Sequence, residues 1–387
     1  MQRPGSGAAD VAVIGGGLVG LATAYELAKR GAAVTIYERG EPARAASWAG
    51  AGMLAPFSES TDPALFALCR QSLAAYPGVV AELHERTGID SRFRRNGTLH
   101  VALDESDVAR LRVRETAVRV AGGDVALLAR DDVLAREPFV AKHVAGGLLV
   151  ANEGQVDNRR LGRALVAAAR GCGVRFERVD EIAVACDERR VRGVRTPQGF
   201  AAVSTVVNAT GAWAGQLAGV PAPVRVPIRP VAGEMFALAL PAGAIRTQLW
   251  HRACYVVPRD DGRLLVGATA VERGFDVRVT ASGLHELLDA ALSFAPALAS
   301  FAVVETWAGL RPATPDGRPY IGATALEGYV VACGHHRNGI LLAPETGRLV
   351  AELIVSGSEP PLLLPFSPCR AAPTFGEGLA TTANPAS

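Results

Sequence analysis

Three observations predict an α/β fold, with α+β character overall. The apolar run at residues 11–14 is followed by a glycine turn, a helical pattern and a second apolar run, which is the order of a β-α-β unit. Short strand-like pieces dominate two later stretches, 91–150 and 227–303. The 387 residues are enough for two domains. We therefore expect a Rossmann-type domain with a parallel sheet, interleaved with an antiparallel-sheet domain that covers a substrate.

The composition is that of a folded protein without a polymeric partner. Hydrophobic residues make up 49% of the chain, which supplies a sizeable core. The 40 basic and 38 acidic residues give a net charge of +2, so the charge favours neither nucleic acid nor an acidic membrane surface. No apolar run reaches the ~18 residues of a membrane span, and residues 1–10 lack the features of a secretion signal. We expect a cytoplasmic protein with no membrane segment.

Cysteine usage predicts neither a disulfide framework nor a metal site. The six cysteines are scattered and form no CxxC pair. Such spacing is typical of buried or unreactive thiols in a reducing compartment.

The turn after the first predicted strand has the spacing of a dinucleotide site. Gly15 allows a tight turn, Gly17 lets the backbone approach a pyrophosphate, and Gly20 lets the next helix pack close to the sheet. The helix begins at Leu18 and Val19, where free N–H groups and the positive end of the helix dipole favour phosphates.

An acidic residue ends the second strand, which we place at 33–37. Glu38 lies about 20 residues after the glycines, where a carboxylate accepts hydrogen bonds from ribose hydroxyls and disfavours a 2′-phosphate. This argues against NADP, but the motif alone leaves NAD and FAD open. Residues 45–56 are small and glycine-rich, as backbone must be where it follows a flat ring system. Residues 209–211, Ala-Thr-Gly, follow a buried strand and place a second bare turn at the sheet edge.

Periodicity and turn residues predict the elements between these motifs. Helices are expected at 63–88, 105–120 and 158–170, the last with Asp157 as its N-cap. Strands are expected at 97–103, 174–179, 181–185, 189–195 and 202–207. Residues 254–269 predict a β-hairpin with an Asp-Gly turn at 261–262.

Two C-terminal segments carry the most specific motifs. Residues 307–322 contain Trp-Ala-Gly-Leu-Arg-Pro, and residues 329–347 contain Gly-His-His-Arg-Asn-Gly-Ile-Leu-Leu-Ala-Pro. Together with the glycine turn and residues 46–53, Ala-Ser-Trp-Ala-Gly-Ala-Gly-Met, they run in order over residues 10–357. In these motifs the sequence resembles the glycine oxidase group of FAD-dependent amino acid oxidases, which are relatives of D-amino acid oxidase and sarcosine oxidase.

The resemblance implies a domain plan and a cofactor, FAD. The FAD-binding domain takes residues 1–90, 151–226 and 304–366, the substrate domain takes 91–150 and 227–303, and 367–387 form a loose tail. Relatives with covalently bound flavin carry a cysteine where this chain has Gly309. The resemblance therefore implies noncovalent FAD.

Arg311 is the residue that the resemblance assigns to the substrate carboxylate. A planar guanidinium can form two parallel, charge-assisted bonds to a carboxylate, which suits that role. Tyr255 matches a hydroxyl that also contacts the carboxylate, and Arg337 matches a second arginine near the flavin and the pocket entrance. The helix that begins near Asn338 is expected to direct its N–H groups at the flavin ring.

The substrate pocket is expected to include Met53, Ala270 and His336. Glycine oxidases often carry a bulkier residue at the position of Ala270, so we expect room for a substrate side chain here. His335 and His336 have an alternative interpretation as packing or hydrogen-bonding residues. The remaining residues that the resemblance places around FAD are Arg39, Ala46, Ser47, Trp48, Gly52, Met53, Val179, Ala209, Thr210, Gly211, Gly334, Arg337, Asn338, Gly339, Ile340 and Leu341.

The implied reaction is oxidation of a small amino acid by hydride transfer to flavin N5. The imine product would hydrolyse to a 2-oxo acid and ammonia, and O₂ would yield H₂O₂. The resemblance further implies a role in thiazole and thiamine biosynthesis and a homo-oligomer, since tetramers occur in the family. A flavin-dependent D-amino acid dehydrogenase with a quinone or protein acceptor stays open as an alternative, as do a catalytically silent flavoprotein and, with least support, an NAD dehydrogenase.

Overall fold

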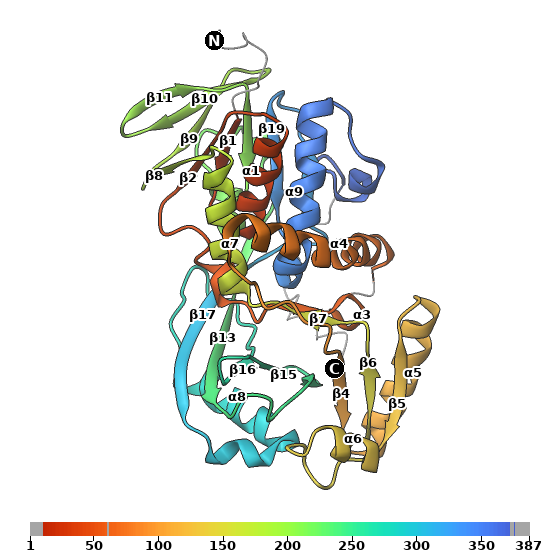
Figure 1. The fold of residues 1–387 in the computed structure, drawn as a ribbon. Coiled ribbons are helices and arrows are strands. Elements are labelled where there is room, and N and C mark those ends of the chain that lie inside the picture. Colours follow the sequence, from red (N-terminus) through yellow and green to blue (C-terminus); the bar gives the residue numbers. More distant parts are fainter. Residues whose placement is uncertain (1–10, 60–61, 372–374, 376–387) are drawn as a thin grey trace.

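Two large sheets organise the chain, the first above the second in Figure 1. The computed structural model describes residues 11–59, 62–371 and 375. The first ten residues and most of the expected tail at 367–387 lie outside the described residues. The first sheet has six strands, in the spatial order β18 (Tyr320–Ala323), β19 (Tyr329–Cys333), β12 (Thr205–Asn208), β1 (Val11–Ile14), β2 (Val34–Glu38) and β8 (Arg175–Arg178).

The six-stranded sheet is parallel except for its edge strand β18. Because successive side chains of a strand point to opposite faces, β1 must be apolar throughout to be buried on both. Val11 and Val13 pack toward one layer, and Ala12 and Ile14 pack toward the other. The helical layer consists of α1 (Leu18–Lys29), α4 (Pro63–Thr87), α7 (Asn158–Gly171) and α9 (Gly339–Ser356), and the opposite layer is a three-stranded sheet of β9 (Ala183–Cys186), β10 (Val191–Thr196) and β11 (Gly199–Ala202).

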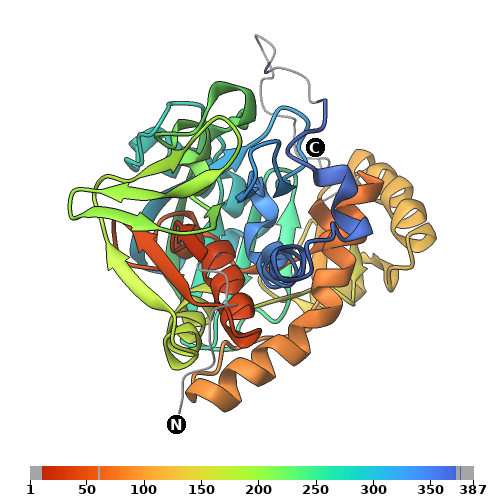
Figure 2. The same ribbon diagram turned by 90° about the horizontal axis from the view of Figure 1, so that it is seen from above.

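Helix α9 lies between α1 and α4, and Figure 2 shows it end-on. Gly347 of α9 faces the backbone of Ala22 in α1, where a Cβ would come within 2.6 Å of the Ala22 carbonyl carbon. On the other side, the Tyr76 hydroxyl of α4 donates to the Ile340 carbonyl over 2.5 Å. The start of α9 is thus fixed from both sides.

By length and composition alone, α4 is the one helix among the described residues that could cross a membrane. Its apolar side chains have another use, because Leu68, Cys69, Tyr76 and Leu83 are buried in the core beneath the six-stranded sheet. A core helix of this kind passes the same test of length and hydropathy.

The second sheet has eight strands, antiparallel except for the pair β14–β4. Helix α8 (Ala281–Phe294) packs against it over a separate apolar core, and α5 (Glu105–Val120) and α6 (Arg130–Arg136) flank its far edge. The spatial order of the strands is β17 (Val303–Ala313), β13 (Arg229–Ala239), β16 (Arg263–Gly267), β15 (Cys254–Pro258), β14 (Gln248–His251), β4 (Thr98–Ala102), β6 (Gly146–Val150) and β5 (Val125–Ala129).

The main elements agree with the sequence predictions, with one difference in domain assignment. The hairpin forms as β15 and β16, and Asp157 caps α7 by accepting from the Arg160 N–H. The expected nucleotide-domain segment from 304 onward, however, opens with β17, which pairs with β13 in the eight-stranded sheet. The chain changes sheets only after Ala313, because an 11-residue strand finds its backbone partner in the equally long β13.

The contact between α1 and α9 generates a stability prediction. We expect Gly347→Ala to lower the free energy of unfolding by about 1–3 kcal/mol, because an added methyl group would separate two packed helices. The control is Gly171→Ala, at the exposed end of α7 with open space around its Cα, which should change stability by less than about 0.5 kcal/mol. Urea unfolding of both variants checks this, and equal stabilities would contradict it.

Candidate cofactor and substrate site

A cavity of about 660 Å³ connects the two sheets. Its first end lies at the carboxyl edge of β1, β2 and β12, where ligands bind in open parallel sheets. Its second end is lined by Tyr255 and Arg311 of the eight-stranded sheet, and residues 335–340 lie along it. Ligand sites of small molecules occupy about 300–1,000 Å³, so the volume suits a bound cofactor.

The glycine turn at the first end has no room for side chains. Gly15 has φ +107°, and a Cβ there would overlap the Ala209 carbonyl. A Cβ on Gly20 would overlap the Gly15 carbonyl, so this residue serves helix–sheet packing, as predicted, and does not line the cavity. Gly17, Leu18 and the adjoining Val19 do line it.

Glu38 and Ser47 complete this end of the cavity. One Glu38 oxygen accepts from the Gly16 N–H at 2.7 Å and the other from the Gly40 N–H at 2.9 Å. The Ser47 hydroxyl accepts from the Leu18 N–H at 2.9 Å, which brings the glycine-rich segment against the start of α1. The other predicted residues that line this part are Arg39, Ala46, Val179, Ala209, Thr210 and Gly211.

The glycine-rich segment continues along the cavity through α2 (Ala46–Ala49) and β3 (Met53–Leu54). Gly52 and Met53 line the cavity, whereas Trp48 does not. The Trp48 ring instead packs under the Arg159 guanidinium at 3.5 Å and meets the edge of Trp307. Trp48 therefore holds α2 against its neighbours.

The turn into α9 lies beside the middle of the cavity. Arg337, Asn338, Gly339 and Ile340 line it, and the N-terminus of α9 supplies the positive end of a helix dipole. Two residues that the sequence predicted for the FAD site, Gly334 and Leu341, lie behind the residues that line the cavity. Gly334 and Leu341 do not line the cavity: Gly334 has φ +81° beneath Thr314, and Leu341 is buried in the core.

Arg311 projects from β17 at the second end of the cavity. Its Nη1 donates to the Thr269 carbonyl at 2.9 Å, and its guanidinium lies close enough to the Tyr255 side chain for the two to shift each other's pKa. The guanidinium lies where a Cβ on Gly233 would be, so this glycine makes room for it. Burial lowers the pKa of Arg311 and raises the pKa of Tyr255, and the electrostatic interaction between the two groups opposes both shifts.

Arg337 is paired with a residue that the sequence did not point to. Its Nε and Nη2 donate to the two oxygens of Glu59, at 2.5 and 3.0 Å, and Glu59 raises the pKa of Arg337 despite the opposing effect of burial. Glu59 ends α3 (Pro56–Glu59) and lines the cavity. Its only signal was a single acid at the end of an apolar segment, which carries no information about a partner 278 residues away.

His335 fits the interpretation as a hydrogen-bonding residue, and His336 fits the interpretation as a pocket residue. His335 is buried, its Nε2 lies 3.0 Å from the Thr346 hydroxyl, and burial lowers its pKa to about 3. His336 lines the cavity, and burial together with Arg311 and Arg337 lowers its pKa to about 3. Both rings are neutral at neutral pH, and His335 is a hydrogen-bonding core residue.

Ala270 does not lie where the sequence placed it. It is exposed and does not line the cavity. The reason is a bridge that follows β16, in which Val271 and Ala232 exchange two backbone hydrogen bonds of 2.9 Å and turn Ala270 outward. Space for a substrate side chain therefore depends on residues such as Met53, Met235 and His336, which do line the cavity.

A buried polar cluster surrounds Ser58, the residue that precedes Glu59. The Glu153 carboxylate accepts from the Ser58 N–H at 2.8 Å and the Ser58 hydroxyl at 2.7 Å, and that hydroxyl lies 2.8 Å from His100 Nε2. Arg114 donates to the Ser58 carbonyl. Burial raises the pKa of Glu153 to about 7, so this carboxyl group titrates near neutrality.

The structural features of the cavity fit FAD. The glycine turn at Gly15 lies against the turn at Ala209, and Gly15 has no room for a side chain. The N-termini of α1 and α9 both lie at the cavity, and Glu38 lies at the position expected for the ribose. Residues 49–52 and Arg311 line the same cavity, which therefore continues beyond the dinucleotide site, as the ring system of a flavin would require.

Comparison with known proteins agrees with this geometry. The family model for FAD-dependent oxidoreductases of the D-amino acid oxidase type matches residues 10–353. The chain belongs to this family. It is 38% identical over 365 residues to a glycine oxidase of Geobacillus kaustophilus, covering 93% of this chain and 97% of that protein. It is also 37% identical to the bifunctional protein ThiO/ThiG of Synechocystis, of which it spans only 54%.

Solved structures of family members show the same fold. The crystal structure of glycine oxidase from Geobacillus kaustophilus matches with a TM-score of 0.89 and covers 95% of this chain and 100% of that one. Iminodiacetate oxidase from Chelativorans sp. BNC1 matches with a TM-score of 0.84 at 28% identity, over 92% of this chain and 98% of that one. The family's FAD-binding fold, with a Rossmann-type domain, is therefore the fold of this chain.

The buried cluster generates a prediction about pH. The pKa of Glu153 is raised in the folded protein, so the folded state binds more protons than the unfolded state between the two pKa values. Its contribution to the free energy of unfolding therefore falls as the pH rises from about 4.5 to about 7, by at most about 1.4 kcal/mol per pH unit. Glu153→Gln should flatten this part of the profile.

Urea unfolding at several pH values across that window, for wild type and variant, measures the difference. The matched control is Glu85→Gln, which changes an exposed glutamate of α4. Parallel profiles for wild type and Glu153→Gln would show that Glu153 does not titrate in this range.

Proposed function

We propose that this chain is an FAD-dependent oxidase of glycine and other small primary and secondary amino acids, such as sarcosine and small D-amino acids. The observation that carries the proposal is the state of Arg311. It is a partly buried guanidinium at the end of the cofactor cavity, and the hydrogen bond that its side chain makes among the described residues goes to a carbonyl, not to a carboxylate. A planar cation with unused donors fits the carboxylate of an amino acid.

The names of the relatives support the same function. Glycine oxidases are among the most similar curated proteins and solved structures, and the structure of an iminodiacetate oxidase is also similar. The bifunctional ThiO/ThiG proteins support a role in thiamine biosynthesis. We also infer a cytoplasmic homo-oligomer, without membrane association, from the family resemblance.

We infer a place for each part of FAD from the residues that line the cavity. Gly15, Gly17 and the N-terminus of α1 would hold the pyrophosphate, Glu38 the ribose, and the N–H groups of residues 338–340 the flavin end. A Cβ at Gly309 would come within 2.5 Å of the Ala49 methyl carbon, so this position has no room for a linking side chain and noncovalent binding follows. When bound, FAD supplies the acceptor of two electrons that are passed on to O₂, giving H₂O₂.

The chain's own contribution is to bind and orient the substrate. Arg311 and Tyr255 would fix the carboxylate, and a fixed carboxylate determines which C–H bond of the α-carbon faces the flavin. Arg337 is already neutralised by Glu59, so one carboxylate satisfies the free positive charge of the pocket.

Among the residues that the structure describes, no strong base lies at the substrate end of the cavity. His336 has a pKa near 3, and Glu59 is held by Arg337. The substrate amine therefore has to react as the neutral base, having lost its proton to water. The imine that leaves the site then hydrolyses in water to a 2-oxo acid and ammonia.

Removing Arg311 tests the assignment. We expect Arg311→Ala to raise the KM for glycine and sarcosine about 100-fold or more, because two charge-assisted bonds of ~1.5–3 kcal/mol each are lost. The control is Arg263→Ala, since Arg263 lies on β16 of the same sheet, pairs with Asp261 and does not line the cavity. H₂O₂ production over a range of substrate concentrations measures KM, and an unchanged KM in Arg311→Ala would place the carboxylate elsewhere.

The electron acceptor has its own test. An oxidase should form one H₂O₂ per glycine consumed in air, whereas the alternative D-amino acid dehydrogenase would reduce a quinone or dye and form little peroxide. Assaying both acceptors on the same preparation with glycine, sarcosine and small and large D-amino acids decides between them and gives the substrate range.

A further inference from the structure

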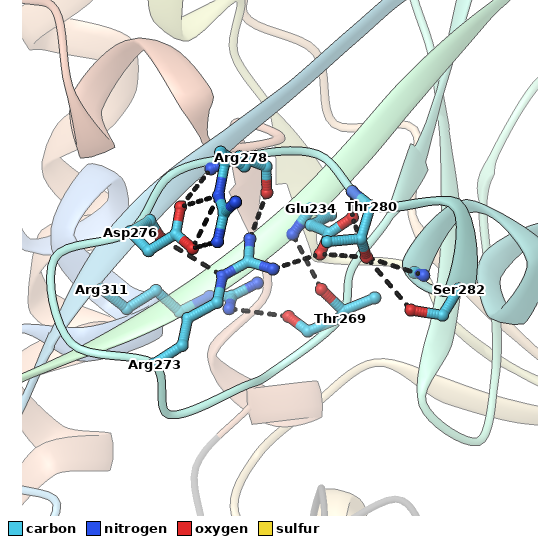
Figure 3. A network of polar contacts seen from close by, with 9 residues as sticks. Glu234, Thr269, Arg273, Asp276, Arg278, Thr280, Ser282 and Arg311 are labelled. Carbon is cyan, nitrogen blue, oxygen red and sulfur yellow. Dashed lines mark hydrogen bonds and ion pairs between the residues drawn. The ribbon is translucent and has the colours of Figure 1, made fainter.

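One polar network ties the substrate end of the cavity to a long irregular segment (Figure 3). Residues 268–280, which we call the strap, connect β16 to α8 without regular secondary structure beyond the bridge at Val271. The strap begins at the position that supplies a carbonyl to Arg311. The position of the strap therefore affects the position of the Arg311 guanidinium, which donates to the strap residue Thr269.

Glu234 of β13 binds the strap at both of its ends. At the first end, its backbone N–H donates to the Thr269 hydroxyl at 2.9 Å, and its carbonyl accepts from the Thr269 N–H at 3.3 Å. At the second end, its carboxylate accepts from the Thr280 N–H at 2.8 Å and the Thr280 hydroxyl at 3.0 Å. A single residue thus fixes two points that are 11 residues apart.

The same carboxylate also binds the middle of the strap through Arg273. Arg273 Nη1 donates to Glu234 at 2.8 Å, and the rest of its guanidinium donates to the carbonyls of Asp276 and Arg278. These bonds fold residues 273–278 around the guanidinium, as Figure 3 shows. Arg273 thus joins residues 276 and 278 of the strap to Glu234 on β13, in addition to the Asp276–Arg278 ion pair and the bridge between Val271 and Ala232.

Burial makes this network rigid. Glu234 is only 1% exposed, and its charge is balanced by Arg273 and by the N-terminus of α8. Gly283, in the first turn of α8, leaves the space that the carboxylate occupies. A buried carboxylate with this set of donors has one favourable geometry, because any displacement would leave a buried charge without a partner.

The network reaches Arg311 through Thr269. The Thr269 carbonyl accepts from Arg311 Nη1 at 2.9 Å, while the hydroxyl and N–H of the same residue are held by Glu234. Gly233, the neighbour of Glu234, is the residue above which the guanidinium lies. The Arg311 guanidinium therefore contacts Thr269, which Glu234 holds, and Gly233, which precedes Glu234 in the chain.

A second contact joins the strap to the cofactor end of the cavity. Phe275 stacks on Trp213, with ring centroids 5.3 Å apart and planes at 22°, and the Arg39 guanidinium lies 3.8 Å from the centre of the same Trp213 ring. Trp213 and Arg39 both line the cavity. The strap thus extends from the substrate end toward the nucleotide domain.

We propose that Glu234, with Arg273, is a positioning residue for substrate binding, which acts through the strap to aim the Arg311 guanidinium at the substrate carboxylate. This inference rests on the proposed function, in which Arg311 binds that carboxylate. Because a displacement of a binding group by about 1 Å costs up to about 100-fold, a loosened strap should weaken carboxylate binding measurably.

The test uses the FAD-loaded enzyme and acetate, which carries a carboxylate but no amine to oxidise. We expect Glu234→Gln to raise the Kd of acetate about tenfold, and the KM of glycine by a similar factor, with kcat at saturating glycine changed about twofold or less. Calorimetry or the flavin absorbance change measures acetate binding without turnover. The matched control is Arg278→Ala, which removes an exposed arginine of the same strap whose side chain binds only Asp276 among the described residues.

Two variants of Arg273 keep the proposal testable if Glu234→Gln folds poorly. Arg273→Met should weaken acetate binding about tenfold, whereas Arg273→Lys, which retains the charge but loses the bonds to the carbonyls of Asp276 and Arg278, should give a Kd between those of Arg273→Met and wild type. The double variant Glu234→Gln/Arg273→Met should lose less than the sum of the two single losses, because both act through one strap.

The outcomes separate this proposal from the proposed function. If Arg311→Ala abolishes acetate binding while the Glu234 and Arg273 variants bind it as wild type does, the positioning role is wrong and the function stands. If those variants lower the melting temperature and FAD affinity but leave the acetate Kd unchanged, their role is only structural and the proposal is overturned. If Arg311→Ala itself binds acetate normally, the assignment of Arg311 fails first.

Discussion

The register of the β13–β17 ladder is the constraint on which the site depends. In that ladder Val231 lies opposite Arg311 and Gly233 lies opposite Gly309. Side chains of opposite residues share a face of the sheet, so Arg311 and the two glycines all face the cavity. The guanidinium extends diagonally over Gly233, and Ala49 of α2 occupies the space above Gly309. A shift of β17 by one residue would turn both Arg311 and Gly309 to the far face and bring larger side chains, such as that of Leu310, to the cavity face.

The same alternation lets one strand serve two purposes. Gly233 faces the cavity, whereas its neighbour Glu234 faces α8 and the strap. The residue that leaves space for Arg311 and the residue that anchors the strap are therefore adjacent in sequence but on opposite faces. The positions of Gly233 and Glu234 depend on the length of β13 and β17, since two paired 11-residue strands keep one register over nearly their whole length.

Three arginines near the cavity, of which Arg259 is buried and Arg311 and Arg337 are partly buried, are stabilised in different ways. Arg337 is paired with Glu59, which cancels its charge. Arg259 donates to neutral oxygens of Ala51, Gln155, Val156 and Asn158 at 2.8–3.0 Å, and burial lowers its pKa to about 10. Arg311 lines the cavity, and the side-chain hydrogen bond that it makes among the described residues goes to the Thr269 carbonyl, which leaves other donors of its guanidinium for a ligand. A site with one free guanidinium matches a ligand with one carboxylate, which is the charge pattern of the amino acids in the proposed reaction.

The sequence was sufficient for features that depend on local spacing. The glycine turn, the cap at Asp157, the Asp-Gly hairpin and the long helix α4 each follow from residues close together in the chain. Site features that depend on distant partners were not predictable in this way. The partner of Arg337 is 278 residues away, and the Glu234–Arg273 pair spans 39 residues across a sheet and an irregular segment.

The errors have the same physical origin. Ala270 was placed over the pocket from its position after a strand, but the bridge between Ala232 and Val271 decides which way it faces. Trp48 lies within a cofactor-binding segment, yet its ring is drawn away by Arg159 and Trp307. In each case a contact with another strand or helix determined the direction of one side chain inside a segment whose general place was known.

Neither sheet contains the whole site, and this has an energetic consequence. The glycine turn and Glu38 belong to the six-stranded sheet, whereas Tyr255 and Arg311 belong to the eight-stranded sheet. A cofactor that lies along the cavity contacts both, so it binds only when the two are assembled. Ligand that binds the folded state alone adds RT ln(1 + [L]/Kd) to the free energy of unfolding, about 2.7 kcal/mol at 100 times Kd. Binding of FAD therefore opposes separation of the two sheets, and the same assembly brings the strap and Arg311 into the geometry that the substrate requires.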